Sequence, residues 1–366
     1  MFRYLSTRKS LFFMVVGLIV FLLYLNFFVG FQELLYVLES LNSVDYAFYY
    51  SLAIAATVLG VFFVAAAWHD LLNSLSVKTR LRSVFLYTWI GYFVDLVVPC
   101  QAVCGEVTRI YLVHKENRES YGPIAASSLT NRIISYVISS VGLLTGILFL
   151  LIRAGEVPAY ILTLLGIALV GTGIYLAALF YLAIEEQAAG KLAGLLFKLI
   201  GFLRLSRYLP ADLPERTQNS LLVLHKGFET FRNKPRCLVK PLIFQFLSLV
   251  LNLVAYVLVF YSLGLRNLYI DFFIIVYFIV GTIQIAAAVF SVGALDIALA
   301  NLFVVYGVPV QFGALAAAML RFLTFWLPIV VGYVTVQVMG ARKLLNPEDR
   351  ENIAVQQTIE GQSSNP

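Results

Sequence analysis

Two arginines lie deep inside long apolar stretches, and they are the side chains in the sequence that are best suited to bind a ligand. Arg132 is about 8 residues into the apolar run 124–152, and Arg321 is about 10 residues into the run 311–339. At a helical rise of about 1.5 Å per residue, each guanidinium is about 12–15 Å below the membrane surface. Because a charge at that depth costs at least about 2.5–3.5 kcal/mol, each arginine should face other helices or a hydrated cavity and find an anion.

Glu106 and Asp296 are the nearest acidic residues in the sequence that could supply this anion. Glu106 also lies three residues before Arg109, so these two can pair locally on one helix face. In one interpretation, the acids and arginines form structural ion pairs that hold the helices together. In the other, they line a translocation site where the arginines attract a phosphate. The two interpretations are compatible, because an ionisable group inside a membrane is a functional hypothesis by default.

Three further polar side chains lie in apolar surroundings. Asp95 comes just before the chain interruption at Pro99. Its preferred role is to accept hydrogen bonds from backbone that the interruption frees, and proton coupling is the alternative. Asn131 and Gln284 are interpreted as hydrogen-bond partners between helices rather than as ligands.

The sequence carries no recognisable catalytic or cofactor-binding motif. It has no P-loop, nucleophile elbow, H-E-x-x-H motif or acidic metal cluster. Its three histidines fall at predicted cytoplasmic boundaries, and Cys100 and Cys104 lack the spacing of a zinc site. We therefore expect no enzyme activity, no cofactor and no metal.

Composition identifies the class of protein that must position these residues. Of 366 residues, 61% are apolar and only 13% are charged, and the mean hydropathy is +0.88. A soluble chain of ordinary composition is excluded, because such chains are about 45–50% apolar and about 25% charged. The net charge of +6 indicates membrane topology rather than nucleic-acid binding.

The apolar runs predict an all-α polytopic membrane protein with six full spans and two re-entrant broken-helix hairpins, arranged as inverted repeats. The hairpins are residues 83–114 and 271–309, each too long for one crossing and interrupted near its middle. The first span follows a basic start but lacks a cleavage site, so it is not a removed signal peptide. The six predicted spans are 11–30, 46–67, 124–152, 159–184, 238–263 and 311–339.

The distribution of positive charge favours cytoplasmic N- and C-termini in a multi-pass plasma-membrane protein. With both hairpins re-entrant, most of the 26 lysines and arginines fall inside, and only Arg153 and Arg266 fall outside. If the first hairpin crossed instead, the most basic loop would be placed outside, against the positive-inside rule.

A weak internal repeat agrees with this topology. When the chain is aligned against itself with an offset of 190 residues, a short helix, a break and an acidic residue coincide in the two halves. An offset of 189 residues then aligns a buried arginine. The aligned pairs are Tyr87 with Tyr277, Gly91 with Gly281, Glu106 with Asp296, and Arg132 with Arg321. Inverted repeats with broken helices that meet near the midplane are typical of alternating-access transporters.

The chain divides into two membrane halves joined by a polar loop. The loop contains a basic amphipathic stretch at 190–208, which either lies on an anionic leaflet or packs on the bundle as a linker helix. The predicted units are an N-terminal half at 1–184, the cytoplasmic loop at 185–237, a C-terminal half at 238–342, and a disordered cytoplasmic tail at 343–366.

Two stretches carry a family resemblance: PCQAVCGEVTRIYLVHKENRESYGPIAASSLTNRI, at residues 99–133, and FSVGALDIALANLFVVYGVPVQFGALAAAMLRFLTFWLP, at residues 290–328. In this order and spacing they resemble the two signatures of the lysylphosphatidylglycerol synthase transmembrane, or flippase-like, family. The second stretch departs from the family pattern, because it has Asp296 where a glutamate is usual and lacks a proline. The resemblance implies an integral membrane lipid translocator, here as a stand-alone member without the cytosolic synthase domain. Functional expectation then passes to Glu106, Arg109, Arg132, Asp296 and Arg321 only.

We therefore predict a lipid flippase or transporter that moves a phospholipid or a polyprenyl-phosphate-linked lipid across the bilayer. Its expected partners are the membrane and a lipid with an anionic head group, without nucleic acid. The alternative is a non-transporting anchor or partner subunit for a cytoplasmic glycosyltransferase or lipid synthase. An intramembrane lipid-modifying enzyme lacks a visible nucleophile or metal constellation.

Overall fold

The computed structural model describes residues 42–97, 103–152, 226–268, 272–278 and 306–345, together with a few short stretches between 39 and 304. Every element in this part of the chain is helical, which agrees with the predicted all-α class. Predictions that fall on the first span, on Asp296, on Gln284, on most of the cytoplasmic loop and on the tail lie outside the described residues.

Four of the described helices are long and apolar enough to cross a membrane, and each matches a predicted span. The predicted span 11–30 lies outside the described residues, and 159–184 lies largely outside them. The chain is therefore an all-α membrane protein, whereas the number of six spans stays a prediction. The four candidate spans are Ser43–Ser74, Tyr121–Leu148, Pro235–Ser262 and Gln311–Gly340.

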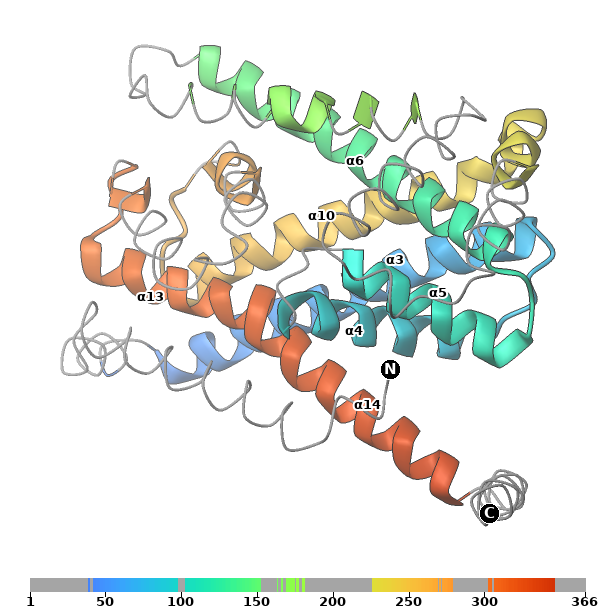
Figure 1. The fold of residues 1–366 in the computed structure, drawn as a ribbon. Helices are drawn as coiled ribbons and strands as arrows, with labels where there is room; N and C mark the ends of the chain where they lie inside the picture. Colours follow the sequence, from blue (N-terminus) through green and yellow to red (C-terminus); the bar gives the residue numbers. More distant parts are fainter. Residues whose placement is uncertain are drawn as a thin grey trace, which may run out of the picture.

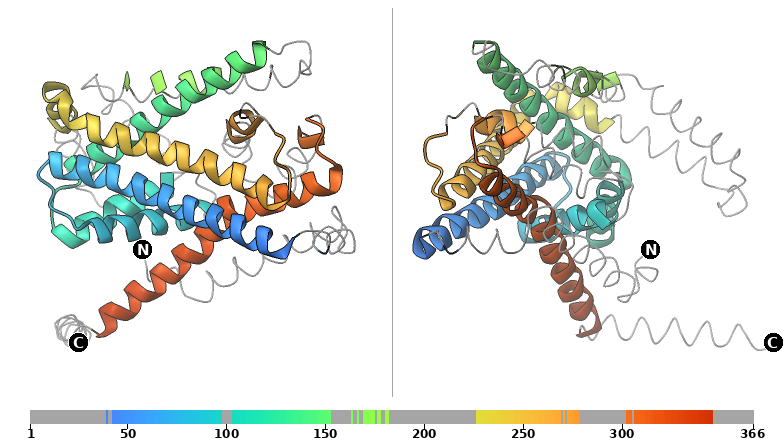
Figure 2. Two further views of the ribbon diagram at one scale, coloured as in Figure 1. Left: turned by 180° about the vertical axis from the view of Figure 1, so that it is seen from behind. Right: turned by 90° about the vertical axis from the view of Figure 1, so that its left-hand side faces the viewer.

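Helices α3 (Ser43–Ser74) and α10 (Val239–Ser262) form the central pair of the bundle. They run side by side along most of their length (Figures 1 and 2), and their mutual contact is the most extensive between any two described helices. Gly60 allows this approach, because a Cβ atom there would be 3.2 Å from the Asn252 side-chain nitrogen.

Helices α4 (Leu81–Val97) and α5 (Val103–Asn117) turn back on each other, at the position of the first predicted hairpin. At the open end of the pair, the Glu116 carboxylate accepts hydrogen bonds from the hydroxyls of Ser83 and Tyr87, both at 2.8 Å. Near the turn, the helices touch through two glycines. A Cβ atom on Gly105 would overlap the Gly91 carbonyl oxygen.

Substituting Gly105→Ala is expected to destabilise the protein by about 1–3 kcal/mol, the usual cost of overpacking. The added methyl would overlap backbone as well as the Asp95 carboxylate, and backbone cannot move aside by a rotamer change. The free energy of unfolding in detergent tests this. Gly340→Ala is the control, because no described atom lies within 4 Å of a Cβ there. Equal stability of the two variants would contradict the close α4–α5 contact.

Helix α6 (Tyr121–Ile152) follows α5 and crosses the bundle beside α10 (Figure 1). The last span was predicted as one continuous run, but it is divided into α13 (Val310–Arg321), a π-helical turn (Phe322–Trp326) and α14 (Leu327–Leu345). Pro328 provides a physical reason, because it lacks the N–H that an α-helix would donate to the Thr324 carbonyl. Such π-helical turns are frequent at functional sites.

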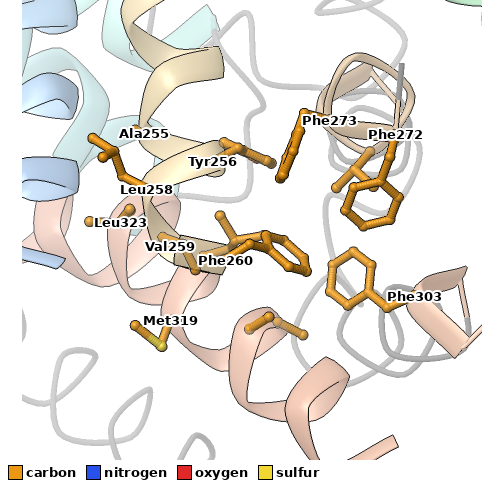
Figure 3. Packing of buried hydrophobic residues seen from close by; sticks show 14 of the residues in the cluster. Ala255, Tyr256, Leu258, Val259, Phe260, Phe272, Phe273, Phe303, Met319 and Leu323 are labelled. Carbon is orange, nitrogen blue, oxygen red and sulfur yellow. The ribbon is translucent and has the colours of Figure 1, made fainter. Parts of the chain in front are cut away.

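Two further packing contacts position the helices, the first between the two halves of the chain and the second within the C-terminal half. Helix α14 packs on α4 at Gly332, where a Cβ atom would be 2.7 Å from the Trp89 carbonyl oxygen. An aromatic cluster joins α10 to the described parts of the second predicted hairpin. Phe260 packs edge to face on Phe272 and Phe303 at centroid distances of 5.1 and 5.2 Å, and Figure 3 shows these rings pointing toward one another.

Candidate functional site

Glu106 is the centre of a buried charge cluster at the start of α5. Its Oε1 atom contacts the Nη2 atom of Arg109 in a short ion pair and the Nη2 atom of Arg132, on α6, at 3.3 Å. Its Oε2 atom accepts a hydrogen bond from the Ser128 hydroxyl. The side chains of Arg109, Arg132 and Glu106 are only 6%, 14% and 16% exposed, so one carboxylate serves two guanidinium groups in the interior.

Arg109 lies within cation–π range of two aromatic rings. Its guanidinium carbon is 5.7 Å from the Trp68 ring centroid and 5.8 Å from that of Tyr92. Gly91 leaves room for this side chain, because a Cβ atom there would be 2.8 Å from Cδ of Arg109. The Trp68 indole N–H in turn donates to the Ser127 hydroxyl at 3.1 Å. The cluster therefore links α3, α4, α5 and α6.

Asn131 lies one residue before Arg132 and connects α6 to α10. Its side-chain oxygen accepts a hydrogen bond of 2.8 Å from the Gln245 amide, and both side chains are buried. Sequence reasoning named Asn131 but missed Gln245, which lies 114 residues further along the chain.

Arg321 is the last residue of α13 and is only 3% exposed. Its guanidinium carbon is 4.9 Å from the Phe325 ring centroid, one turn further along the chain. The predicted partner of Arg321, Asp296, lies outside the described residues, as does Gln284. The predicted second acid–arginine pair therefore stays a prediction.

Asp95 lies in the last turn of α4 and faces the start of α5. Its Oδ1 atom accepts a hydrogen bond of 2.7 Å from the backbone N–H of Gly105. This N–H is one of the first amides of α5, which have no partner within their own helix. Asp95 also lines a cavity, so this residue lies between the backbone of α5 and open space.

The cavity has a volume of about 410 Å³ and lies between α3, α4, α6, α10 and the π-helical turn before α14. Of the predicted site residues, Asp95 alone is among the described residues that line it. The polar residues of the lining are Thr57, Tyr92, Asp95, Tyr136, Ser139, Thr172, Ser248, Asn252, Tyr256, Tyr277 and Thr324.

Sequence reasoning missed this cavity because its polar groups are single hydroxyls and amides spread over separate apolar runs. A usable signal was present in the run 238–263, where Ser248 and Asn252 lie four residues apart on one helix face. Among the residues that the structure describes, no three His, Cys, Asp or Glu side chains gather as a metal-binding group.

Comparison with known proteins places the chain in a family of membrane proteins. The profile of the family described as "Lysylphosphatidylglycerol synthase TM region" matches residues 14–332. The chain is also similar to UPF0104 membrane protein PH1989 of Pyrococcus horikoshii, with 21% identity over 299 residues, which covers 80% of this chain and 87% of that protein. No solved structure matches the chain.

Proposed function

The chain belongs to the lysylphosphatidylglycerol synthase transmembrane family, and from this premise we propose that it is a lipid flippase that moves a phospholipid or polyprenyl-phosphate-linked lipid across the plasma membrane. The head group would pass through the cavity, and the acyl or prenyl tails would stay in lipid.

The depth of the polar cavity carries this proposal. Polar groups at the centre of a membrane bundle are costly and mark pathways for polar substrates. The cavity is lined near the middle of all four candidate spans: by Thr57 in Ser43–Ser74, Tyr136 in Tyr121–Leu148, Ser248 in Pro235–Ser262 and Thr324 in Gln311–Gly340.

Backbone conformation supports the proposed inverted repeat. Four residues in the described part of the chain have a left-handed backbone: Ser76, Arg118, Gly264 and Gly307. Ser76 and Gly264 follow the ends of α3 and α10 and lie 188 residues apart. Arg118 follows the first predicted hairpin and Gly307 lies near the end of the second. These two residues are 189 positions apart, which is also the spacing of the two buried arginines.

With six spans, two re-entrant hairpins and both termini cytoplasmic, the cavity would lie at the junction of the two repeats. Transporters of this architecture hold their substrates at this junction, near the midplane. The lining is contributed by α3, α4 and α6 from the first half, and by α10, the π-helical turn and α14 from the second.

In this mechanism, Arg132 and Arg321 hold the phosphate of the head group. Glu106 is the competing anion at Arg132, because it pairs with this arginine at 3.3 Å. Asp296 would act in the same way at Arg321. When the phosphate replaces the Glu106 carboxylate at Arg132, the ion pair between α5 and α6 would break. Arrival of the lipid would thereby release the first hairpin from α6.

Arg132→Ala is expected to abolish lipid movement and to lower stability, because Glu106 loses one of its two cationic partners in the interior. The measurement is transbilayer movement of fluorescent lipids in liposomes that contain the purified protein. Arg266→Ala is the matched control. Arg266 pairs with Asp45 at 3.2 Å but is 53% exposed, so its ion pair contributes about 0–1 kcal/mol.

Normal transport by a folded Arg132→Ala variant would contradict the role of this arginine. Absence of movement of any lipid by the wild-type protein would instead favour the alternative, an anchor for a cytoplasmic glycosyltransferase or lipid synthase. Deleting residues 190–208 separates the two, because an anchor would lose its partner and a flippase would keep its activity.

A further inference from the structure

The cavity is almost free of charge along its described lining. Asp95 is the one carboxylic acid there, and none of the described lining residues is a lysine, arginine or histidine. A phosphate binds most strongly to cationic side chains, whereas the described lining offers neutral groups and one carboxylate. The described lining therefore favours an uncharged part of the head group over the phosphate.

Some of the donors in the lining already have partners within their own helices. The hydroxyls of Thr57 and Thr324 donate to carbonyls of their own helices, those of Ala53 and Leu320, at 2.9 and 3.0 Å. The Asn252 amide nitrogen likewise donates to the Ser248 carbonyl at 2.8 Å. The oxygen lone pairs of these groups and of Asp95 can accept hydrogen bonds, and the tyrosine and serine hydroxyls of the lining can both donate and accept. The cavity therefore matches a polyol, whose hydroxyls also do both.

Both polyols and ammonium groups donate hydrogen bonds, and the composition of the lining distinguishes them. Of the eleven polar residues in the described lining, ten carry a neutral hydroxyl or amide, and Asp95 alone carries a carboxylate. Many neutral partners match the several hydroxyls of a polyol, whereas an ammonium group would find a single opposite charge.

We propose that the cavity between α3, α4, α6 and α10 binds an uncharged, hydroxyl-rich head group such as glycerol or a sugar, with Asp95 as a specificity-determining residue. This inference rests on the proposed function and names its substrate class. The volume of about 410 Å³ is in the lower part of the range of about 300–1,000 Å³ for small-molecule sites. It therefore suits a head group rather than acyl chains. In this bound state, the phosphate of the same lipid would lie toward the arginines.

Binding is tested separately from transport, so that the two proposals can fail independently. The thermal unfolding midpoint of the purified full-length protein in detergent is measured with short-chain lipids that share their acyl chains. The first group of lipids carries glycerol or glucose as its head group, and the second group carries ethanolamine, choline or bare phosphate. We expect the glycerol and glucose lipids to raise the midpoint and the other three to have little effect, because bound ligand stabilises the folded state.

Two variants assign the effect to the cavity. Asn252→Leu, which removes an amide at similar volume, should weaken glycerol-lipid binding about tenfold. Asp95→Asn keeps an acceptor for the Gly105 N–H but loses the charge, and should weaken the same binding severalfold. Asp70→Asn is the control, because Asp70 lies at the end of α3 outside the cavity lining.

Each alternative outcome has a distinct meaning. A larger shift with the ethanolamine lipid, lost in Asp95→Asn, would overturn the proposal in favour of a cationic head group. The proposal would also be overturned if bare phosphate alone raised the midpoint, or if none of the lipids raised it. Selective binding of polyol lipids without transport would support the binding site and contradict the flippase. Transport without head-group selectivity would support the flippase and contradict the binding site.

Discussion

Replacing Glu106 with alanine is expected to destabilise the protein by about 3 kcal/mol and to abolish lipid movement. The substitution removes a carboxylate that contacts both Arg109 and Arg132, and both guanidinium groups stay buried. Breaking a buried pair from one side typically costs about 3–5 kcal/mol, because the remaining charge is uncompensated. The Ser128 hydroxyl would lose its acceptor as well.

The measurement is the free energy of unfolding in detergent, together with the transport assay. Glu116→Ala is the control, because its carboxylate accepts hydrogen bonds only from neutral hydroxyls in the described structure, at the exposed end of the first hairpin. The double variant Glu106→Ala with Arg132→Ala should be less destabilised than the sum of its single variants, because it removes acid and cation together. Additive effects, or a Glu106→Ala variant as stable as wild type, would contradict the charge cluster.

The first hairpin and its charge cluster could be expected from the sequence because strong physical constraints act on them. A long apolar run with a proline in its middle cannot cross as one helix, so the expected hairpin at 83–114 is close to the observed helices from Leu81 to Asn117. Arg132 needs an anion at its depth, and the structure brings it to Glu106.

The aromatic partners of Arg109 could not be expected in the same way. Trp68 and Tyr92 look like ordinary residues of apolar helices, and nothing in their local spacing marks contact with a cation. Trp68 is 41 residues before Arg109, and the contact depends on how α3 packs against the α4–α5 pair. Ser128 is similar, because its bond to Glu106 joins residues 22 positions apart.

The cavity is the feature that sequence reasoning is least able to predict, because a cavity is defined by where side chains do not reach. Its shape depends on close contacts elsewhere, such as those at Gly60 between α3 and α10, and at Gly332 between α4 and α14. These contacts fix helix spacing to within a methyl group. A pattern of apolar and polar residues carries no information at that scale.

Filling the cavity with Ser139→Phe is expected to abolish lipid movement while the protein stays folded. Ser139 lines the cavity from α6, near the middle of its span, and a phenyl ring there would occupy space that the proposed head group needs. Because the ring enters existing open space instead of a packed contact, the cost in stability should stay below the range of about 1–3 kcal/mol for overpacked cores.

Transport in liposomes and the thermal unfolding midpoint in detergent, measured on the same preparations, test this expectation. Thr145→Phe is the matched control, because Thr145 lies on the exposed side of α6, less than two turns further along the helix. It should transport at the wild-type rate. Ser139→Phe should also remove the stabilisation by polyol lipids, because binding and passage depend on the same space. If a folded Ser139→Phe variant still moves lipid, the head group takes another path and the cavity is not the translocation site.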